Sequence, residues 1–211
     1  MKKEKKIQSI GVFGGTFNPI HNGHLLIAEE ARTRLKLDKV IFIPSANPPH
    51  KEMSGLVEGR HRLKMIGSAI KNNPFFMASD IELKRGGRSY SIETIKTLKE
   101  KYSKGTKVFF IMGADSILEF MTWKNWEDLL KLCNLVVSPR PGYKVNLNAT
   151  KSKMQRKLCD KSLVKNIYFI ETSAFDISST EVRKSIKKGG SVKYFIPEGV
   201  IEYINKNKLY K

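Results

Sequence analysis

Residues 14–24 read GGTFNPIHNGH and join a short apolar run to a helical pattern. The run before them, residues 10–13, has the β-branched and aromatic character of a buried strand. After them, apolar residues recur at helical spacing at Leu25, Leu26, Ala28, Ala31 and Leu35. In a parallel α/β sheet such a junction lies at the carboxyl end of a strand, where the start of a helix offers free N–H groups and a positive dipole end to anions. The stretch therefore predicts a turn that binds a nucleotide phosphate.

Apolar runs of β type alternate with helical patterns along the whole chain. After residues 10–13, the runs that we expect to be strands are residues 39–44, 76–83, 107–113, 134–141 and 167–172. The expected helices follow His24, cover residues 59–71, 91–102 and 127–132, and continue after residue 172. This alternation predicts right-handed βαβ units. We therefore expect an α/β fold: a Rossmann-like, doubly wound, mostly parallel sheet with helices on both faces. Irregular structure is expected at the basic N-terminus, near residues 51–59 and over residues 143–153.

The composition is that of one globular domain. The 211 residues are 40% hydrophobic, which allows a sizeable core in a single domain over residues 1–211. No run of about 18 apolar residues and no signal peptide is present, so we expect a cytoplasmic protein without a membrane partner. Cys133 and Cys159 are widely spaced and form no CxxC motif. They are expected to be structural thiols, not a disulfide or part of a zinc site.

The chain is strongly basic, with 39 Lys and Arg against 20 Asp and Glu, a net charge of +19 and a pI near 9.9. Such a charge attracts polyanions, so nucleic acid is a candidate partner. The lysines are, however, scattered along the chain, without the interleaved aromatic residues that stack on RNA bases. A solvated lysine-rich surface is therefore the preferred interpretation, and a nucleic-acid partner is not expected.

Two common nucleotide-binding motifs are absent from the sequence. There is no GxxxxGK(S/T), and Gly11, Gly14 and Gly15 do not form GxGxxG. These absences argue against a P-loop NTPase and against a dinucleotide-dependent dehydrogenase.

The turn itself carries groups suited to a phosphate. Gly14 and Gly15 let the backbone approach a phosphate closely, and Thr16 adds a hydroxyl. His21 and His24 are three residues apart and can share one face of a helix, where imidazoles can donate hydrogen bonds and stabilise charge on a leaving pyrophosphate. An HxxH pair can also be half of a metal site, but no further cluster of ligands appears elsewhere in the sequence.

Residues 177–183, ISSTEVR, form a second motif at the start of a predicted helix. Ser178 and Glu181 have the spacing of a capping box, which is a purely structural interpretation. Ser179 and the free amides of the first turn also make a cradle for an anion, and Arg183 lies one turn further along to hold a phosphate. Both interpretations can hold together.

Two further stretches are candidates, each with a structural alternative. Lys51 in the sequence PPHK can reach a phosphate, or it is a surface lysine in a Pro-rich loop. Trp123 follows the sequence GADS of residues 113–116 and can stack on an aromatic ring, whereas Trp126 has the place of a core residue. From these residues alone, packing is the preferred explanation for both tryptophans.

Taken together, these motifs resemble the nucleotidyltransferase α/β superfamily, whose signatures are GTFDPxHxGH near the N-terminus and ISSTxxR near the C-terminus. Within it, the chain is most similar to the bacterial nicotinate-mononucleotide adenylyltransferase family. The resemblance covers nearly the full length and includes PPHK, the SYS segment at residues 89–91, GADS, Trp123, the RPG segment at residues 140–142 and the closing YINKNKLY.

The resemblance implies an enzyme of NAD biosynthesis that transfers the adenylyl group of ATP to nicotinate mononucleotide. It implies Mg²⁺ carried on the ATP phosphates instead of on protein side chains, no tightly bound organic cofactor, and a possible homo-oligomer. His21, His24 and Arg183 would be the catalytic residues and would hold the ATP phosphates. The ATP site would also include Gly14, Gly15, Thr16, Phe17, Gly113, Asp115, Ile177, Ser178 and Ser179. Nicotinate mononucleotide would contact Lys51, Tyr90, Ser91, Asp115 and Trp123, with the tryptophan stacked on the pyridine ring. The C-terminal part, about residues 176–211, would be helical and carry ISSTEVR.

The chain departs from the family pattern at three positions. Asn18 stands where the family commonly has Asp, Ser91 where it has Thr, and Lys124 where a Tyr often follows the tryptophan. Two other interpretations stay open: an adenylyltransferase for another small substrate, such as phosphopantetheine or nicotinamide mononucleotide, and a basic RNA-binding module on a vestigial nucleotide fold.

Overall fold

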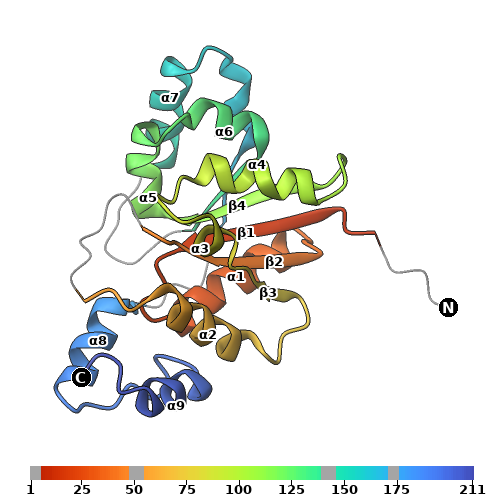
Figure 1. The fold of residues 1–211 in the computed structure, drawn as a ribbon. Helices are drawn as coiled ribbons and strands as arrows, with labels where there is room; N and C mark the ends of the chain where they lie inside the picture. The colour runs from red at the N-terminus through yellow and green to blue at the C-terminus, as the bar shows by residue number, and fades with distance from the viewer. Residues whose placement is uncertain (1–5, 48–54, 139–145, 171–175) are drawn as a thin grey trace.

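The fold is an all-parallel, six-stranded sheet with the strand order β3-β2-β1-β4-β5-β6 (Figure 1). The computed structural model describes residues 6–47, 55–138, 146–170 and 176–211. The strands are β1 (Ser9–Gly15), β2 (Lys39–Pro44), β3 (Phe76–Ala78), β4 (Lys107–Gly113), β5 (Asn134–Ser138) and β6 (Ile167–Phe169). The helices are α1 (Asn22–Arg34), α2 (Gly59–Ile70), α3 (Ile81–Arg85), α4 (Ser91–Lys101), α5 (Ala114–Glu119), η1 (Phe120–Thr122), α6 (Trp126–Leu132), α7 (Leu147–Lys157), η2 (Lys161–Asn166), α8 (Ser179–Lys187) and α9 (Glu198–Lys206). The predicted doubly wound α/β fold is confirmed.

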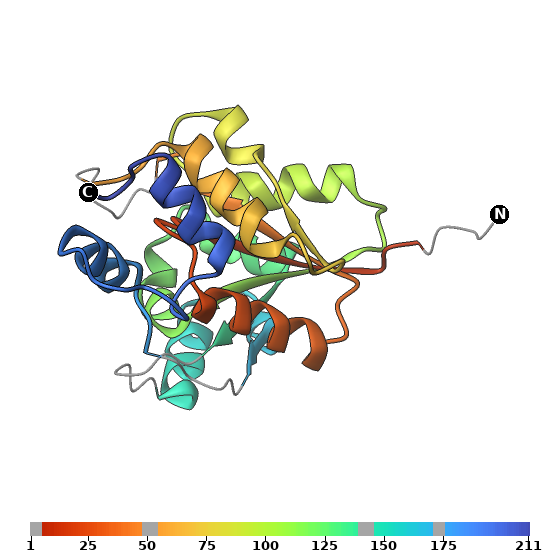
Figure 2. The same cartoon turned by 90° about the horizontal axis from the view of Figure 1, so that it is seen from below.

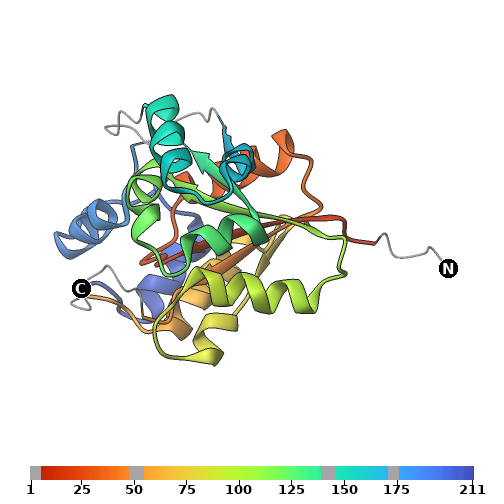
Figure 3. The same ribbon diagram turned by 90° about the horizontal axis from the view of Figure 1, so that it is seen from above.

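Each face of the sheet carries its own hydrophobic core. Helices α1, α2, α8 and α9 lie on one face (Figure 2), and their apolar residues form one core together with Phe42 of β2. Helices α4, α5, α6 and α7 lie on the other face (Figure 3), and their apolar residues form a second core together with Ile43. Successive strand residues therefore point into different cores, as the period of two in a strand requires. No helix among the described residues is long and apolar enough to cross a membrane.

One helix lies where the sequence predicted irregular structure. Residues 143–145 are outside the described residues, but α7 begins at Leu147 and runs to Lys157. Asn146 caps this helix, because its side chain accepts a hydrogen bond of 2.9 Å from the backbone N–H of Ala149. Met154 is fully buried and anchors this largely polar helix to the core. From Thr150 to Lys157 it is the buried residue of the helix, so this stretch shows little apolar periodicity.

The run at residues 76–83 was expected to be one strand, and this is wrong in its second half. Strand β3 ends at Ala78, and α3 begins at Ile81. The buried carboxylate of Glu82 accepts a hydrogen bond of 2.7 Å from the Thr94 hydroxyl of α4. This tertiary contact holds the short helix against α4.

The two cysteines differ in their surroundings. Cys133 is buried and its thiol donates to the Leu129 carbonyl at 3.3 Å, so its structural role is confirmed. Burial raises the pKa of the Cys133 thiol to about 12. Cys159 is exposed, and its expected role as a structural thiol stays a prediction.

Candidate active site

The predicted site residues gather at the point where the sheet changes its winding direction. Strands β1 and β4 are neighbours paired up to Phe13 and Ile111, and the helices that follow them, α1 and α5, pack on opposite faces. In open parallel sheets the crevice outside the carboxyl ends of such strands is where ligands bind. The turn after Gly15 and the turn after Gly113 therefore leave the sheet side by side.

The turn after β1 reverses the chain sharply. Phe17 has a φ of +48°, in the left-handed region, and its ring is only 2% exposed. A Cβ atom on Gly15 would lie 3.0 Å from that ring, so any larger residue would press on the Phe17 side chain. Because its ring is buried in the core, Phe17 can offer a ligand its backbone but not its aromatic face. The role implied for Phe17 at the ATP site is thus limited to the main chain.

The two histidines stack at the start of α1. Their ring centroids are 3.6 Å apart at an interplanar angle of 25°, and the edge of Phe17 packs against His24 with a centroid distance of 5.0 Å. The backbone N–H of His21 donates a hydrogen bond of 3.2 Å to Nδ1 of His24. Since a neutral imidazole has one donor and one acceptor, Nε2 of His24 then carries the proton. His24 is thereby set as a donor at Nε2.

Helix α8 docks directly on the phosphate turn (Figure 1). The Ser179 hydroxyl donates to the carbonyl of Pro19 at 2.9 Å, and Nη1 of Arg183 donates to the carbonyl of Asn18 at 2.8 Å. These residues are about 160 positions apart in the chain. These contacts place the N-terminus of α8 and the Arg183 guanidinium at the turn between β1 and α1.

The capping interpretation of ISSTEVR is also confirmed. Ser178 is the N-cap of α8, and its hydroxyl oxygen accepts a hydrogen bond of 3.1 Å from the N–H of Glu181. The hydroxyl in turn donates to the Glu181 carboxylate at 2.9 Å. Ile177 lies just before the cap, with its Cβ 3.9 Å from where a Cβ on Gly23 would stand. The motif therefore caps α8 and also places the start of this helix at the turn after β1.

Asp115 lies over the end of β4. Gly113 is the N-cap residue of α5, and a Cβ atom placed on it would come within 2.5 Å of Oδ1 of Asp115. The carboxylate therefore folds back over Gly113 at the mouth of the crevice, and a larger residue at this position would displace it.

A second cluster lies on the other face of the sheet, around Tyr90 and Trp123. Tyr90 is the N-cap residue of α4, next to Ser91. The Lys124 ammonium lies 4.2 Å from the centroid of the Tyr90 ring and 2.9 Å from a carboxylate oxygen of Glu93, and this hydrogen bond lowers the pKa of Glu93. Trp123 is half-buried and packs edge-on against Phe110 of β4, 6.0 Å between centroids. Tyr90 and Trp123 are thus linked through the lysine that departs from the family pattern.

A buried arginine behind the turn was missed by sequence reasoning. Arg62 of α2 is 1% exposed, and its guanidinium donates to two carbonyls, Val57 O and Thr16 O, both at 2.8 Å. Burial lowers the pKa of Arg62. A signal was present in the sequence, because Arg62 shares its face of α2 with Met65 and Ile66 at i+3 and i+4, both of which are fully buried.

The contacts of Asn18 with Gly55 and with half-buried Tyr210 explain the Asn18 departure. The Asn18 side chain is 6% exposed; its amide donates to Gly55 O at 2.9 Å, and its oxygen accepts from the Tyr210 hydroxyl at 2.7 Å. Burial raises the pKa of Tyr210. An ionised aspartate at position 18 has no N–H to give to Gly55.

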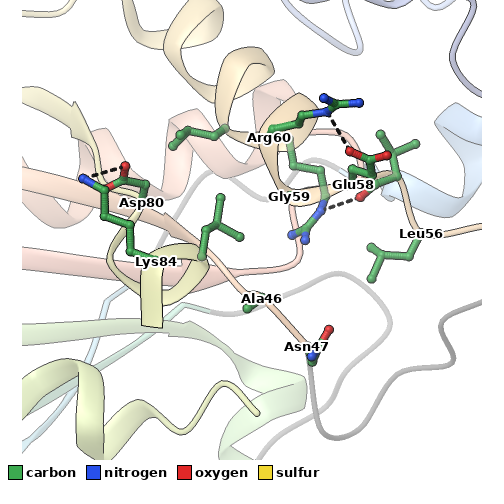
Figure 4. A pocket seen from close by; sticks show the side chains of 12 residues that line it. Ala46, Asn47, Leu56, Glu58, Gly59, Arg60, Asp80 and Lys84 are labelled. Atoms are coloured by element: carbon green, nitrogen blue, oxygen red, sulfur yellow. Dashed lines mark hydrogen bonds and ion pairs between the residues drawn. The ribbon is translucent and has the colours of Figure 1, made fainter. Parts of the chain in front are cut away.

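A hollow of about 620 Å³ adjoins this network at the carboxyl end of β2 (Figure 4). Two ion pairs line it, Arg60 with Glu58 at 2.6 Å and Lys84 with Asp80 at 3.1 Å. Asn47 lies at its edge. Lys51 and the rest of PPHK, like the RPG segment, lie outside the described residues, so the predicted contact of Lys51 has no counterpart here.

The structure thus brings the predicted residues into two groups at the carboxyl edge of the sheet. The first, the phosphate-binding cluster, comprises the turn after β1, the two histidines and the start of α8, and its apolar members belong to one core. The aromatic group comprises Tyr90, Ser91, Trp123 and Lys124, and its apolar members pack on the other core. Gly113 and Asp115 lie at the end of β4, next to β1.

Comparison with known proteins identifies the family. The sequence model of the cytidylyltransferase-like family matches residues 12–185. The chain is 45% identical over 202 residues to a probable nicotinate-nucleotide adenylyltransferase of Thermoanaerobacter sp. (strain X514), covering 96% of this chain and 94% of the relative. It is 44% identical over 201 residues to a protein of the same name from Clostridium novyi (strain NT), covering 95% and 98%.

A solved structure supports the fold. Plasmodium falciparum nicotinic acid mononucleotide adenylyltransferase complexed with NaAD superposes with a TM-score of 0.75 at 23% identity, over 96% of this chain and 97% of that chain. By the matched family model and by these full-length relatives, the chain belongs to the cytidylyltransferase-like family and groups there with the nicotinate-nucleotide adenylyltransferases.

Proposed function

We propose that this protein transfers the adenylyl group of ATP to nicotinate mononucleotide, forming nicotinic acid adenine dinucleotide and pyrophosphate. One observation carries the proposal: the starts of α1 and α8 meet on the turn after β1, with Ser179 and Arg183 bonded to it at 2.9 and 2.8 Å. Two helix N-termini, two imidazoles and a guanidinium at one turn are suited to a triphosphate. The names of the full-length relatives support the same reaction.

The chemistry needs positioning and charge stabilisation more than a protein nucleophile. The 5′-phosphate of nicotinate mononucleotide is already anionic and attacks the α-phosphorus of ATP in line; the bond to pyrophosphate breaks and its electron pair leaves with the pyrophosphate. His24, with its proton on Nε2, donates to the phosphate oxygens on which charge develops, and His21 and Arg183 add positive or donor groups beside it.

The aromatic group supplies a site for the second nucleotide. Trp123 is half-buried and keeps part of its ring exposed, so it can stack on the pyridine ring. Tyr90 and Ser91 at the start of α4 receive the nicotinate carboxylate, with the Lys124 ammonium 4.2 Å from the Tyr90 ring. Asp115 at the end of β4 contacts the nucleotides between the two groups.

The donor set fits a magnesium ion that arrives with ATP. Among the residues described, no three histidine, cysteine or acidic side chains converge on one point. The N–H donors of the phosphate-binding cluster suit the triphosphate that carries the ion, and the Asp115 carboxylate, which lies over Gly113 at the end of β4, suits the ion. Bound to the triphosphate, Mg²⁺ would neutralise charge on the leaving pyrophosphate. Asp115 is the side chain that we expect to reach its hydration shell.

A substrate panel tests the proposal. Pyrophosphate release is measured with ATP and, in turn, nicotinate mononucleotide, nicotinamide mononucleotide and phosphopantetheine. We expect release to be fastest by far with nicotinate mononucleotide. Fastest release with phosphopantetheine would assign the protein to another substrate. Salt-sensitive RNA binding with no release from any acceptor would favour the RNA-binding alternative.

A further inference from the structure

The guanidinium of Arg62 is held behind the phosphate turn, away from solvent. It is 1% exposed and donates to Thr16 O and Val57 O, each at 2.8 Å. Within the described part of the chain, no carboxylate lies within ion-pair distance of it. Burying a charge that has no carboxylate in contact is costly unless its hydrogen bonds are satisfied, and Arg62 makes two such bonds, both to backbone carbonyls.

The bond to Thr16 fixes the direction of the next peptide N–H. A trans peptide is planar, so its C=O and N–H groups point in opposite directions. With Thr16 O drawn toward Arg62 on one side, the N–H of Phe17 points to the other side of the turn. Among the described residues, this N–H donates to no acceptor. Phe17 has a φ of +48°, so the backbone turns sharply at this residue.

The same turn is held at Asn18 O by Arg183, at 2.8 Å. Two guanidiniums thus bind carbonyls on either side of the Phe17 residue and leave its N–H as the donor between them. A cation on the carbonyl side of a peptide also polarises that peptide and strengthens its N–H as a donor.

We infer that Arg62 is a positioning residue, which aims the Phe17 N–H at a phosphate oxygen of ATP without touching ATP itself. The inference rests on the proposed function only in taking ATP as the ligand of the turn. It assigns to α2, which carries none of the signature residues, a part in building the phosphate site.

The test distinguishes an effect of Arg62 on the direction of the Phe17 N–H from an effect of its positive charge alone. Arg62→Lys keeps the charge, but one shorter ammonium cannot reproduce the fork in which Nε donates to Val57 O and Nη1 to Thr16 O. We therefore expect the Kd for α,β-methylene-ATP and the KM for ATP to rise about tenfold or more. The KM for nicotinate mononucleotide should stay within about twofold. Arg60→Lys, on the same helix and paired with Glu58 at the surface, is the matched control and should change neither constant.

A second measurement begins with the wild-type protein and so gives a result even where Arg62→Lys does not fold. In ¹⁵N spectra of the wild-type protein, the Phe17 amide should shift on titration with α,β-methylene-ATP. Where Arg62→Lys folds, this shift should be lost in it. A wild-type Phe17 amide that does not respond, or an Arg62→Lys protein with unchanged Kd, overturns the inference. Because these readouts measure binding, they stand even where no adenylyl transfer is found, and failure of the proposed function is seen separately in the substrate panel.

Discussion

Substitutions of His24 separate its two ring nitrogens. Nδ1 accepts the hydrogen bond of 3.2 Å from the His21 N–H, and Nε2 is the donor proposed for phosphate. His24→Asn places an oxygen close to the position of Nδ1 and has no group at Nε2, whereas His24→Gln places an amide N–H near Nε2. His24→Ala removes both functions.

The magnitudes follow from these contacts. Loss of one preorganised donor to developing charge costs roughly 2.7–4 kcal/mol, or about 10²–10³ in kcat. We therefore expect kcat to fall by about this factor in His24→Asn and His24→Ala, and by less in His24→Gln. Loss of the hydrogen bond from the His21 N–H costs about 1 kcal/mol of stability, or about 2–4 °C in Tm. That loss should appear in His24→Ala and not in His24→Asn.

Pyrophosphate release under saturating substrates gives kcat, and a thermal melt of each variant gives Tm. A His24→Asn enzyme with near-wild-type kcat would refute the role of Nε2. A drop in kcat that only parallels a drop in Tm across the series would reduce His24 to a structural residue.

Three further predictions concern single contacts. Ser178→Ala removes the N-cap of α8 and should lower the free energy of unfolding by about 1 kcal/mol in a urea titration; an unchanged midpoint would contradict the cap. Lys124→Met removes the ammonium near the Tyr90 ring and should lower the ratio of kcat/KM for nicotinate over nicotinamide mononucleotide about fivefold, since a unit charge placed about 4 Å from a carboxylate in water is worth about 1 kcal/mol; an unchanged ratio would show that Lys124 does not interact with the nicotinate carboxylate. The pKa of Cys133 is raised to about 12, so its thiol stays protonated at pH 8, and iodoacetamide should label exposed Cys159 first by mass spectrometry; equal labelling would contradict the burial.

The sheet could be predicted because its strands are apolar and its turns carry strong signals. KVFFIMG and NLVVS lie in the centre of the sheet with mostly buried side chains and read as strands without ambiguity. Helix α7 could not be predicted, because its sequence is mostly polar and shows little apolar periodicity. The short helix α3 was missed because its stability comes from the contact between Glu82 and Thr94, which apolar patterning does not reveal.

The phosphate site was predictable as far as its residues lie in two compact motifs. That both motifs meet on one turn is a tertiary fact, seen in the bond between Arg183 and Asn18 across 165 positions. The network behind the turn joins Asn18 to Tyr210 across 192 positions. Side chains that bind backbone carbonyls have no sequence pattern on the partner side, because any residue supplies a carbonyl.

The most direct test of the central claim is pyrophosphate release with ATP and nicotinate mononucleotide, followed together with formation of the dinucleotide. We predict that release requires both substrates and that one nicotinic acid adenine dinucleotide forms for each pyrophosphate. Release at the same rate from ATP alone, or without formation of the dinucleotide, would contradict the account.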